Sequence, residues 1–233
     1  MVKSELIQRS PLRILEKSIN GGVGRGNIGL IASKKGVGKT ACLVHIATDK
    51  LFRERHVIHV SFSKRTDHII SWYEDIFNEI SKKKNLENAL AIHDEIIRNR
   101  VIMNFSQRNI DVSQILKSLE AMIVNGNFKA DAVIIDGFEI EQMSLEGLKK
   151  IKDFAIALNL EVWISASLKK EDLVFDENGF PYELKELSDR FDVLITLKYD
   201  DQNIRMDIVK DHDNAVNMES HLFLDPKTLL ILD

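Results

Sequence analysis

Residues 27–52 read NIGLIASKKGVGKTACLVHIATDKLF, and they contain the strongest indication of the fold in the chain. The apolar run that ends at Ser33 predicts a buried strand, and the residues from Lys39 onward have the apolar spacing of a helix. Between them, SKKGVGKT makes a glycine-rich turn at residues 33–40. Such a turn directs backbone NH groups and the positive end of the helix dipole toward an anion. The stretch therefore predicts a phosphate-binding loop.

The residue types in this loop match the tasks of phosphate binding. Lys39 would reach the outer phosphates of a nucleotide, and Thr40 would offer its hydroxyl to magnesium. The pattern GxxxxGK[ST] lacks its first glycine, which is Ser33 here, so we expect less backbone freedom and an altered loop at that point. The predicted nucleotide contacts are Ser33, Lys34, Lys35, Gly36, Val37, Gly38, Lys39, Thr40 and Ala41.

A second segment predicts a metal ligand. KADAVIIDGFE, residues 129–139, places four apolar residues before Asp136, as in a buried central strand that ends in an acid. The carboxyl ends of strands in an open α/β sheet face the ligand crevice. Turn chemistry alone also favours aspartate after a strand, but the phosphate loop favours a metal site. We predict that Asp136 binds magnesium beside Thr40, through a coordinated water.

The rest of the chain alternates between two patterns. Short β-rich runs predict strands, and the segments between most of them have helical spacing, so the sequence predicts one α/β domain over residues 1–233 with a mainly parallel central sheet flanked by helices. The predicted strands are 27–33, 56–62, 100–105, 132–136, 161–165 and 192–197, and the predicted helices are 39–52, 67–80, 112–124 and 145–158. The last runs, 204–209, 221–224 and 229–232, predict antiparallel edge strands.

One segment interrupts this alternation. Residues 82–99 are charged and predict an additional helix or insertion, with Leu86, Leu90 and Ile97 as its buried stripe.

Composition narrows the function classes. The single cysteine, Cys42, cannot form an intramolecular disulfide, and the first residues lack the apolar run of a secretory signal, so we expect a cytoplasmic protein. No stretch is long and apolar enough to predict insertion into a membrane. The net charge of -4 lacks the basic excess of tight polyphosphate binders, so nucleic acid is not an expected partner.

Five stretches carry a resemblance to a known group. They are INGGVGRGNIGLIASKKGVGKT (19–40), VIHVSFS (57–63), the run 109–139 that ends in IIDGFE, PYELKELSDRFDVLITL (181–197) and IRMDIVKDHDN (204–214). Together they resemble the RecA-like P-loop ATPases that include KaiC-like and DnaB-like proteins. The resemblance implies ATP and Mg²⁺ as cofactors and a homo-oligomer, either a ring or a dimer, with nucleotide near the interface.

The chain departs from that group at the catalytic base. In the resembled proteins the second strand ends in a glutamate that activates water, whereas Ser63 and Lys64 stand here. A positioned base is worth roughly 10² to 10⁴ in rate, so we expect slow or absent hydrolysis. The substitutes for the base would be Asp67, Glu139 or Glu141, with Lys39 as a further candidate for catalysis.

Two further positions depart from the group. Lys210 matches a lysine that reaches the neighbouring subunit's nucleotide, but His212 replaces the accompanying arginine and lacks its bidentate fork. Both remain candidates for contacts in trans. A hydroxyl residue after the third core strand, Ser165 or Ser167, would sense the γ-phosphate, although packing in a strand end explains a serine equally well.

The sequence favours an ATP- and magnesium-binding protein in which the nucleotide regulates assembly or contact with an unknown protein partner. A ring-forming ATPase that acts on nucleic acid is the first alternative. The acidic stretch 171–183, in which DENG predicts a hairpin turn, counts against phosphate contact. A ParA- or MinD-like partition ATPase is a second alternative, because Lys34 stands where those proteins carry a second lysine. A third is an interaction module without nucleotide binding.

Overall fold

The computed structural model describes residues 12–63, 65–84, 89–106, 111–139, 144–169, 174–214, 216 and 221–226. These residues form an eight-stranded sheet in the order β3-β2-β4-β5-β1-β6-β7-β8. Its strands are β1 (Ile28–Ser33), β2 (Val57–Ser61), β3 (Arg100–Asn104), β4 (Ala132–Asp136), β5 (Glu161–Ser167), β6 (Val193–Asp200), β7 (Asn203–Asp211) and β8 (His221–Leu224). The predicted strand 229–232 lies outside the described residues.

Strand pairing confirms the predicted architecture. The strands β1 to β6 pair in parallel, whereas β7 pairs with β6 and β8 in antiparallel register. Parallel pairing requires crossover connections, which the alternating helices supply. The result is an α/β sheet that is mainly parallel and has antiparallel strands at its C-terminal edge.

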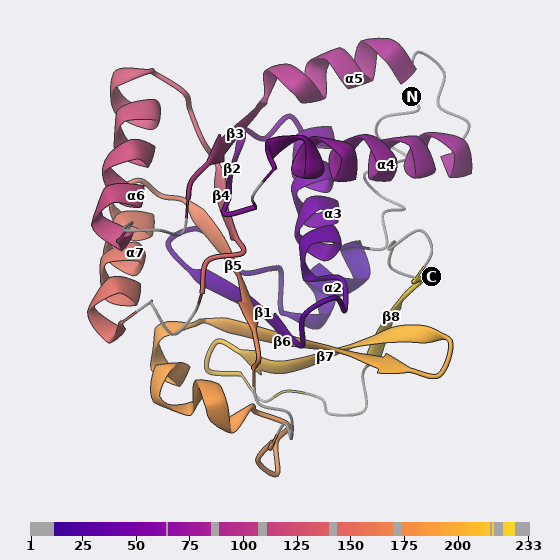
Figure 1. The fold of residues 1–233 in the computed structure, drawn as a ribbon, viewed down its shortest axis with the longest axis vertical. Helices are drawn as coiled ribbons and strands as arrows, with labels where there is room; N and C mark the ends of the chain where they lie inside the picture. Colours follow the sequence, from indigo (N-terminus) through magenta and orange to yellow (C-terminus); the bar gives the residue numbers. More distant parts are fainter. Residues whose placement is uncertain are drawn as a thin grey trace.

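Helices cover both faces of this sheet (Figure 1). On one face lie α2 (Leu12–Ser18), α3 (Lys39–Phe52), α4 (Thr66–Lys84) and α5 (Ala89–Arg98), and on the other lie α6 (Val112–Glu120) and α7 (Leu145–Ala157). A π-helical turn, Ala121–Asn125, extends α6, and a 3-10 helix, Tyr182–Arg190, leads into β6. Each face has its own apolar core, so the sheet is buried on both sides, as parallel sheets are.

The predicted insertion at 82–99 needs correction in its buried side. The structure divides it between the end of α4 and the whole of α5. Leu90 and Ile97 are 83% and 44% exposed, so the predicted buried stripe is wrong at both, and Leu86 lies outside the described residues. The core contacts come from Ile96, with Ile92 packed beside it. The apolar residues of α5 occupy more than one side of the helix, and the periodicity alone did not indicate which side packs.

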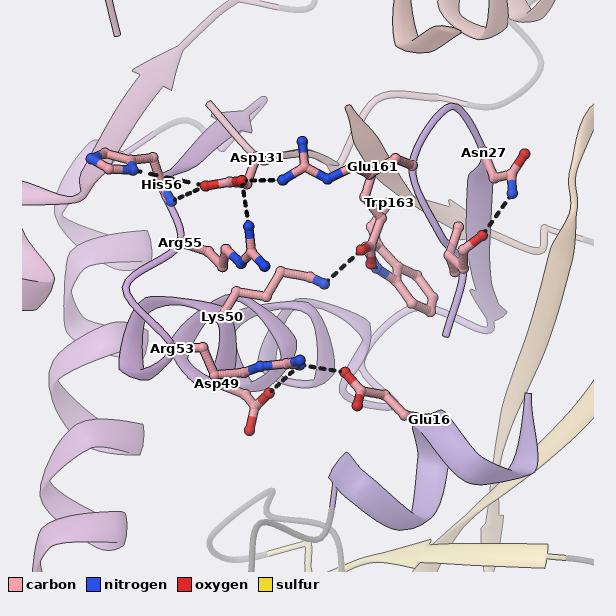
Figure 2. A network of polar contacts seen from close by, with 12 residues as sticks. Glu16, Asn27, Asp49, Lys50, Arg53, Arg55, His56, Asp131, Glu161 and Trp163 are labelled. Carbon is pink, nitrogen blue, oxygen red and sulfur yellow. Dashed lines mark hydrogen bonds and ion pairs between the residues drawn. The ribbon is translucent and has the colours of Figure 1, made fainter. Parts of the chain in front are cut away.

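Ion pairs join the elements at the amino ends of the parallel strands (Figure 2). Asp131, just before β4, accepts hydrogen bonds from the backbone NH of His56 at 2.9 Å and from Arg55 at 3.1 Å. Lys50, near the end of α3, lies 2.7 Å from a carboxylate oxygen of Glu161 at the start of β5. These contacts fix the C-terminal end of α3 to the sheet, while its first turn lies at the opposite, carboxyl edge.

Candidate functional site

The phosphate loop lies at the carboxyl edge of the sheet, between β1 and α3. Gly36 and Gly38 have φ angles of 87° and 116°, in the region that favours glycine, and Gly38 is the residue that caps α3. No described side chain accepts a hydrogen bond at this cap. The first-turn NH groups of α3 therefore face the loop with the positive end of the helix dipole, which is the arrangement that binds anions.

Ser33 fits the loop without strain. It is the last residue of β1, is buried, and is not among the described residues with positive φ, so the position where the motif has its first glycine is extended here. Its hydroxyl donates to the carbonyl of Lys34 at 2.9 Å. The expected altered backbone is absent at this residue.

Lys39 folds back onto the loop. Its ammonium donates to the carbonyls of Ser33 and Lys34 at 3.1 and 3.0 Å and to the Ser33 hydroxyl at 3.2 Å. Only 8% of the residue is exposed. Burial lowers the pKa of Lys39 to about 8, although the negative charge of Asp136 opposes that shift. The amine is therefore held at the loop's centre by neutral acceptors that an anion could replace.

Asp136 ends β4 and meets the first turn of α3. The Thr40 hydroxyl donates to Oδ2 of Asp136 at 2.8 Å across 96 residues of sequence. On the other side, the Ser165 hydroxyl donates to Oδ1 at 2.7 Å and accepts from the backbone NH of Gly137 at 2.8 Å. The carboxylate is thus held between two hydroxyls.

Thr40 and Asp136 fit a magnesium ion. A hydroxyl and a carboxylate are hard oxygen donors, and Mg²⁺ commonly takes one or two protein groups and completes its shell with water and phosphate oxygens. The described residues contain no cluster of three or more acidic, histidine or cysteine ligands, so a cage made of protein alone is not present among them. A metal shared with a bound phosphate suits this pair.

The position of the expected base is filled by an aromatic cluster. Phe62, directly after β2, is buried, and its ring centroid lies 5.9 Å from that of Phe105 and 4.8 Å from that of Phe138. The Ser63 hydroxyl donates to the carbonyl of Arg65 at 3.0 Å. The chain between β2 and α4 thus packs and turns without presenting a carboxylate at its start.

The proposed substitutes for the base are engaged elsewhere. Asp67 pairs with Arg65, whose hydrogen bond lowers the pKa of that carboxyl and makes it a weaker base. Glu139 lies 3.4 Å from the ammonium of Lys169. Glu141 lies outside the described residues.

Lys210 and His212 lie at the end of β7, where Asp211 pairs with Val193 at the start of β6. They are therefore at the edge of the sheet opposite to the phosphate loop of their own chain. The Lys210 ammonium donates to the Ser188 carbonyl at 2.8 Å. Burial lowers the pKa of His212, but hydrogen bonds with Asp211 and the Val23 carbonyl raise it above its ordinary value overall. His212 therefore carries more positive charge than a free histidine.

Sequence reasoning missed Tyr199. This residue lies near the end of β6, is 64% exposed, and its hydroxyl donates to the carbonyl of Gly36 in the phosphate loop at 3.2 Å. In the sequence it is one aromatic residue just beyond a strand-like run that is predicted to end at residue 197. The extension of β6 depends on its pairing with β7, which a local pattern does not reveal.

A cavity of about 160 Å³ lies at the other edge of the sheet, among the ion pairs of Figure 2. Its charged lining residues neutralise one another: Arg53 pairs with Glu16, Lys50 with Glu161, and Arg55 with Asp131. We assign it no ligand, because paired charges already satisfy the groups that would bind one. Within the described part of the chain, every helix is too short or too polar for a membrane span.

Comparisons with known proteins support the fold. No protein-family model and no curated protein matches the sequence. Among solved structures, the chain is similar to the ATPase domain of a DnaB-like helicase, with a TM-score of 0.70 and 16% identity over 95% of this chain and 89% of that chain. The architecture is that of a RecA-like P-loop domain. At this identity the likeness shows the fold, and function has to be argued from the residues.

Proposed function

We propose that this chain, like the KaiC-like and DnaB-like proteins it resembles, binds ATP with magnesium and uses the nucleotide to control its assembly or its contact with a protein partner, with slow or absent hydrolysis. The observation that carries the proposal is the hydrogen bond between Thr40 and Asp136, which joins the phosphate loop to the acid of β4. The same two groups would bind the metal ion of a bound nucleotide.

Each residue of the loop has a role in this proposal. The NH groups of residues 36–41 would cradle the phosphates at the positive end of α3. Lys39 would leave its carbonyl partners for the outer phosphates, a stronger charge-assisted interaction. Magnesium, when bound, supplies positive charge that neutralises the phosphates and fixes their orientation.

Slow turnover follows from the groups beside the outer phosphates. After β2 the chain presents Phe62 and Ser63, and neither accepts a proton usefully near neutral pH. The carboxylates of Asp67 and Glu139 are paired with Arg65 and Lys169. A bound nucleotide would therefore persist long enough to act as a signal, in a homo-oligomer where Lys210 and His212 contact the neighbouring nucleotide.

Calorimetry and a turnover assay test the two halves of this proposal. We expect wild-type protein to bind ATP in the presence of Mg²⁺, Lys39→Ala to lose binding, and Asp136→Asn to bind ATP without its magnesium dependence. Lys149→Ala, which changes a lysine on α7, is the control for loss of charge. Absent binding in the wild type would refute nucleotide binding. Brisk release of phosphate from radiolabelled ATP would refute slow hydrolysis and leave binding intact.

A hydrolysing ATPase is the second candidate, because the similar structure is described as an ATPase domain. It would use Glu139, freed from Lys169, as its base, and a ring that acts on nucleic acid would be its assembly. This candidate predicts turnover stimulated by single-stranded DNA, a hexamer by light scattering, and loss of turnover in Glu139→Gln. Failure to see stimulated turnover in the assembled protein would exclude it.

A further inference from the structure

The β6–β7 hairpin extends beyond the end of the phosphate-loop strand. Register between β1 and β6 ends at the pair Ala32 and Thr196, and β1 itself ends at Ser33. β6 continues to Asp200 and turns into β7 at Asn203. Figure 1 shows this hairpin projecting past the body of the sheet. Its tip therefore lies at the edge that carries the phosphate loop.

Tyr199 is the aromatic residue of this projection. Along β6, Ile195 and Leu197 are buried in the core beneath α3, and Tyr199 continues the same alternate row. Because β1 has already ended, the ring meets the loop instead of a neighbouring strand. The hydrogen bond from its hydroxyl to the Gly36 carbonyl, at 3.2 Å, fixes the ring against the loop, while 64% of the residue stays exposed.

The ring lies on the side of the loop away from the metal ligands. In the sheet order, β5 and β4 follow β1 on one side, and β6 follows it on the other. Asp136 is on β4 and approaches Thr40, so outer phosphates and magnesium would lie toward β4. A triphosphate bound in this direction extends its nucleoside toward β6, where Tyr199 stands.

We infer that the ring of Tyr199 is the surface on which the base of the bound nucleotide stacks. The inference rests on the proposed nucleotide binding and adds the subsite for the base. Stacking tolerates any base, because every base has a π-face, and it supplies no hydrogen-bond readout. The ligand class is thus a nucleoside triphosphate, and Tyr199 contributes equally to adenine and guanine nucleotides. The ring, rather than the hydroxyl, makes the contact with the ligand.

Binding of three probes separates the base from the phosphates. Calorimetry with Mg²⁺ and ATP, GTP or inorganic tripolyphosphate compares wild type with Tyr199→Ala and Tyr199→Phe. We expect Tyr199→Ala to weaken ATP and GTP by the same factor, about 5- to 100-fold, and to leave tripolyphosphate unchanged. Tyr199→Phe keeps the ring and should bind ATP as the wild type does. Tyr182→Ala, at an exposed tyrosine on the 3-10 helix, is the matched control and should change none of the three.

Other outcomes overturn the inference in distinct ways. Equal weakening of all three probes by Tyr199→Ala would show that the residue acts on the loop, and no weakening would show that the base lies elsewhere. Loss of ATP affinity in Tyr199→Phe would assign the effect to the hydroxyl. If wild-type protein binds tripolyphosphate but gains nothing from a base, the phosphate site stands and this inference falls. If it binds none of the probes, the proposed function itself fails.

Discussion

Ser165 holds one oxygen of Asp136 while Thr40 holds the other. This geometry favours a positioning role for Ser165 at the metal carboxylate. Ser165→Ala leaves Oδ1 of Asp136 and the NH of Gly137 without this partner, so we expect the free energy of unfolding to fall by about 1–3 kcal/mol in urea denaturation. Ser167→Ala, at the less buried end of the same strand, is the control. Unchanged stability in Ser165→Ala would remove the positioning role.

Lys39 gives nucleotide binding a pH dependence. Burial lowers its pKa to about 8 in the free protein, and phosphate would raise it in the complex. Above pH 8 the free loop has lost the proton that the complex needs, whereas below pH 8 both states carry it. We therefore expect ATP affinity to be flat from pH 7 to 8 and then to weaken by up to about tenfold per pH unit.

Titration calorimetry at pH 7, 8 and 9 with Mg²⁺ measures this dependence. Lys39→Arg is the matched variant, because a guanidinium stays charged through this range, and its affinity, although altered, should not vary with pH. A wild-type affinity that is constant up to pH 9 would contradict the lowered pKa.

Among the helices and strands, most of the secondary structure follows from the sequence. The helix 39–52 has the predicted bounds, because a glycine cap precedes it and its apolar spacing runs to Phe52. β5 and β6 run further than predicted, to Ser167 and Asp200. Their last residues are polar or exposed and are kept in strand form by neighbouring strands. Local periodicity contains no information on such pairing, which is why Tyr199 was missed.

The contact between β1 and β5 depends on a small residue. A Cβ on Gly29 would lie 2.7 Å from Cε3 of Trp163 and 2.7 Å from Cγ2 of Val23. We expect Gly29→Ala to lower the free energy of unfolding by about 1–3 kcal/mol, because an added methyl overpacks this contact. Trp163→Phe removes ring atoms that the methyl would meet. In a double-mutant cycle the two changes together should therefore cost less than the sum of their separate effects, and strict additivity would contradict the clash.

The strand order of the complete sheet could not be predicted from the sequence. The parallel core was predicted from the alternation of strands and helices, and the meeting of Thr40 with Asp136 from the rule that carboxyl ends share an edge. That β5 lies between β1 and β4 depends on contacts far apart in sequence. The direction in which a nucleotide would lie, and with it the role of Tyr199, could be argued only once that order was known.

Nucleotide binding should stabilise the whole domain, because the site joins the loop, α3 and the end of β4, which are separated in the unfolded chain. At a ligand concentration of 100 times Kd the free energy of unfolding rises by about 2.7 kcal/mol. For a chain of this size that corresponds to an increase in Tm of roughly 5–11 °C. We expect this increase with ATP and Mg²⁺ in differential scanning calorimetry, a smaller one with EDTA, and none in Lys39→Ala. An equal increase in Lys39→Ala would place the stabilising site away from the phosphate loop, because that variant removes the side chain expected to contact the outer phosphates while leaving every surface outside the loop intact.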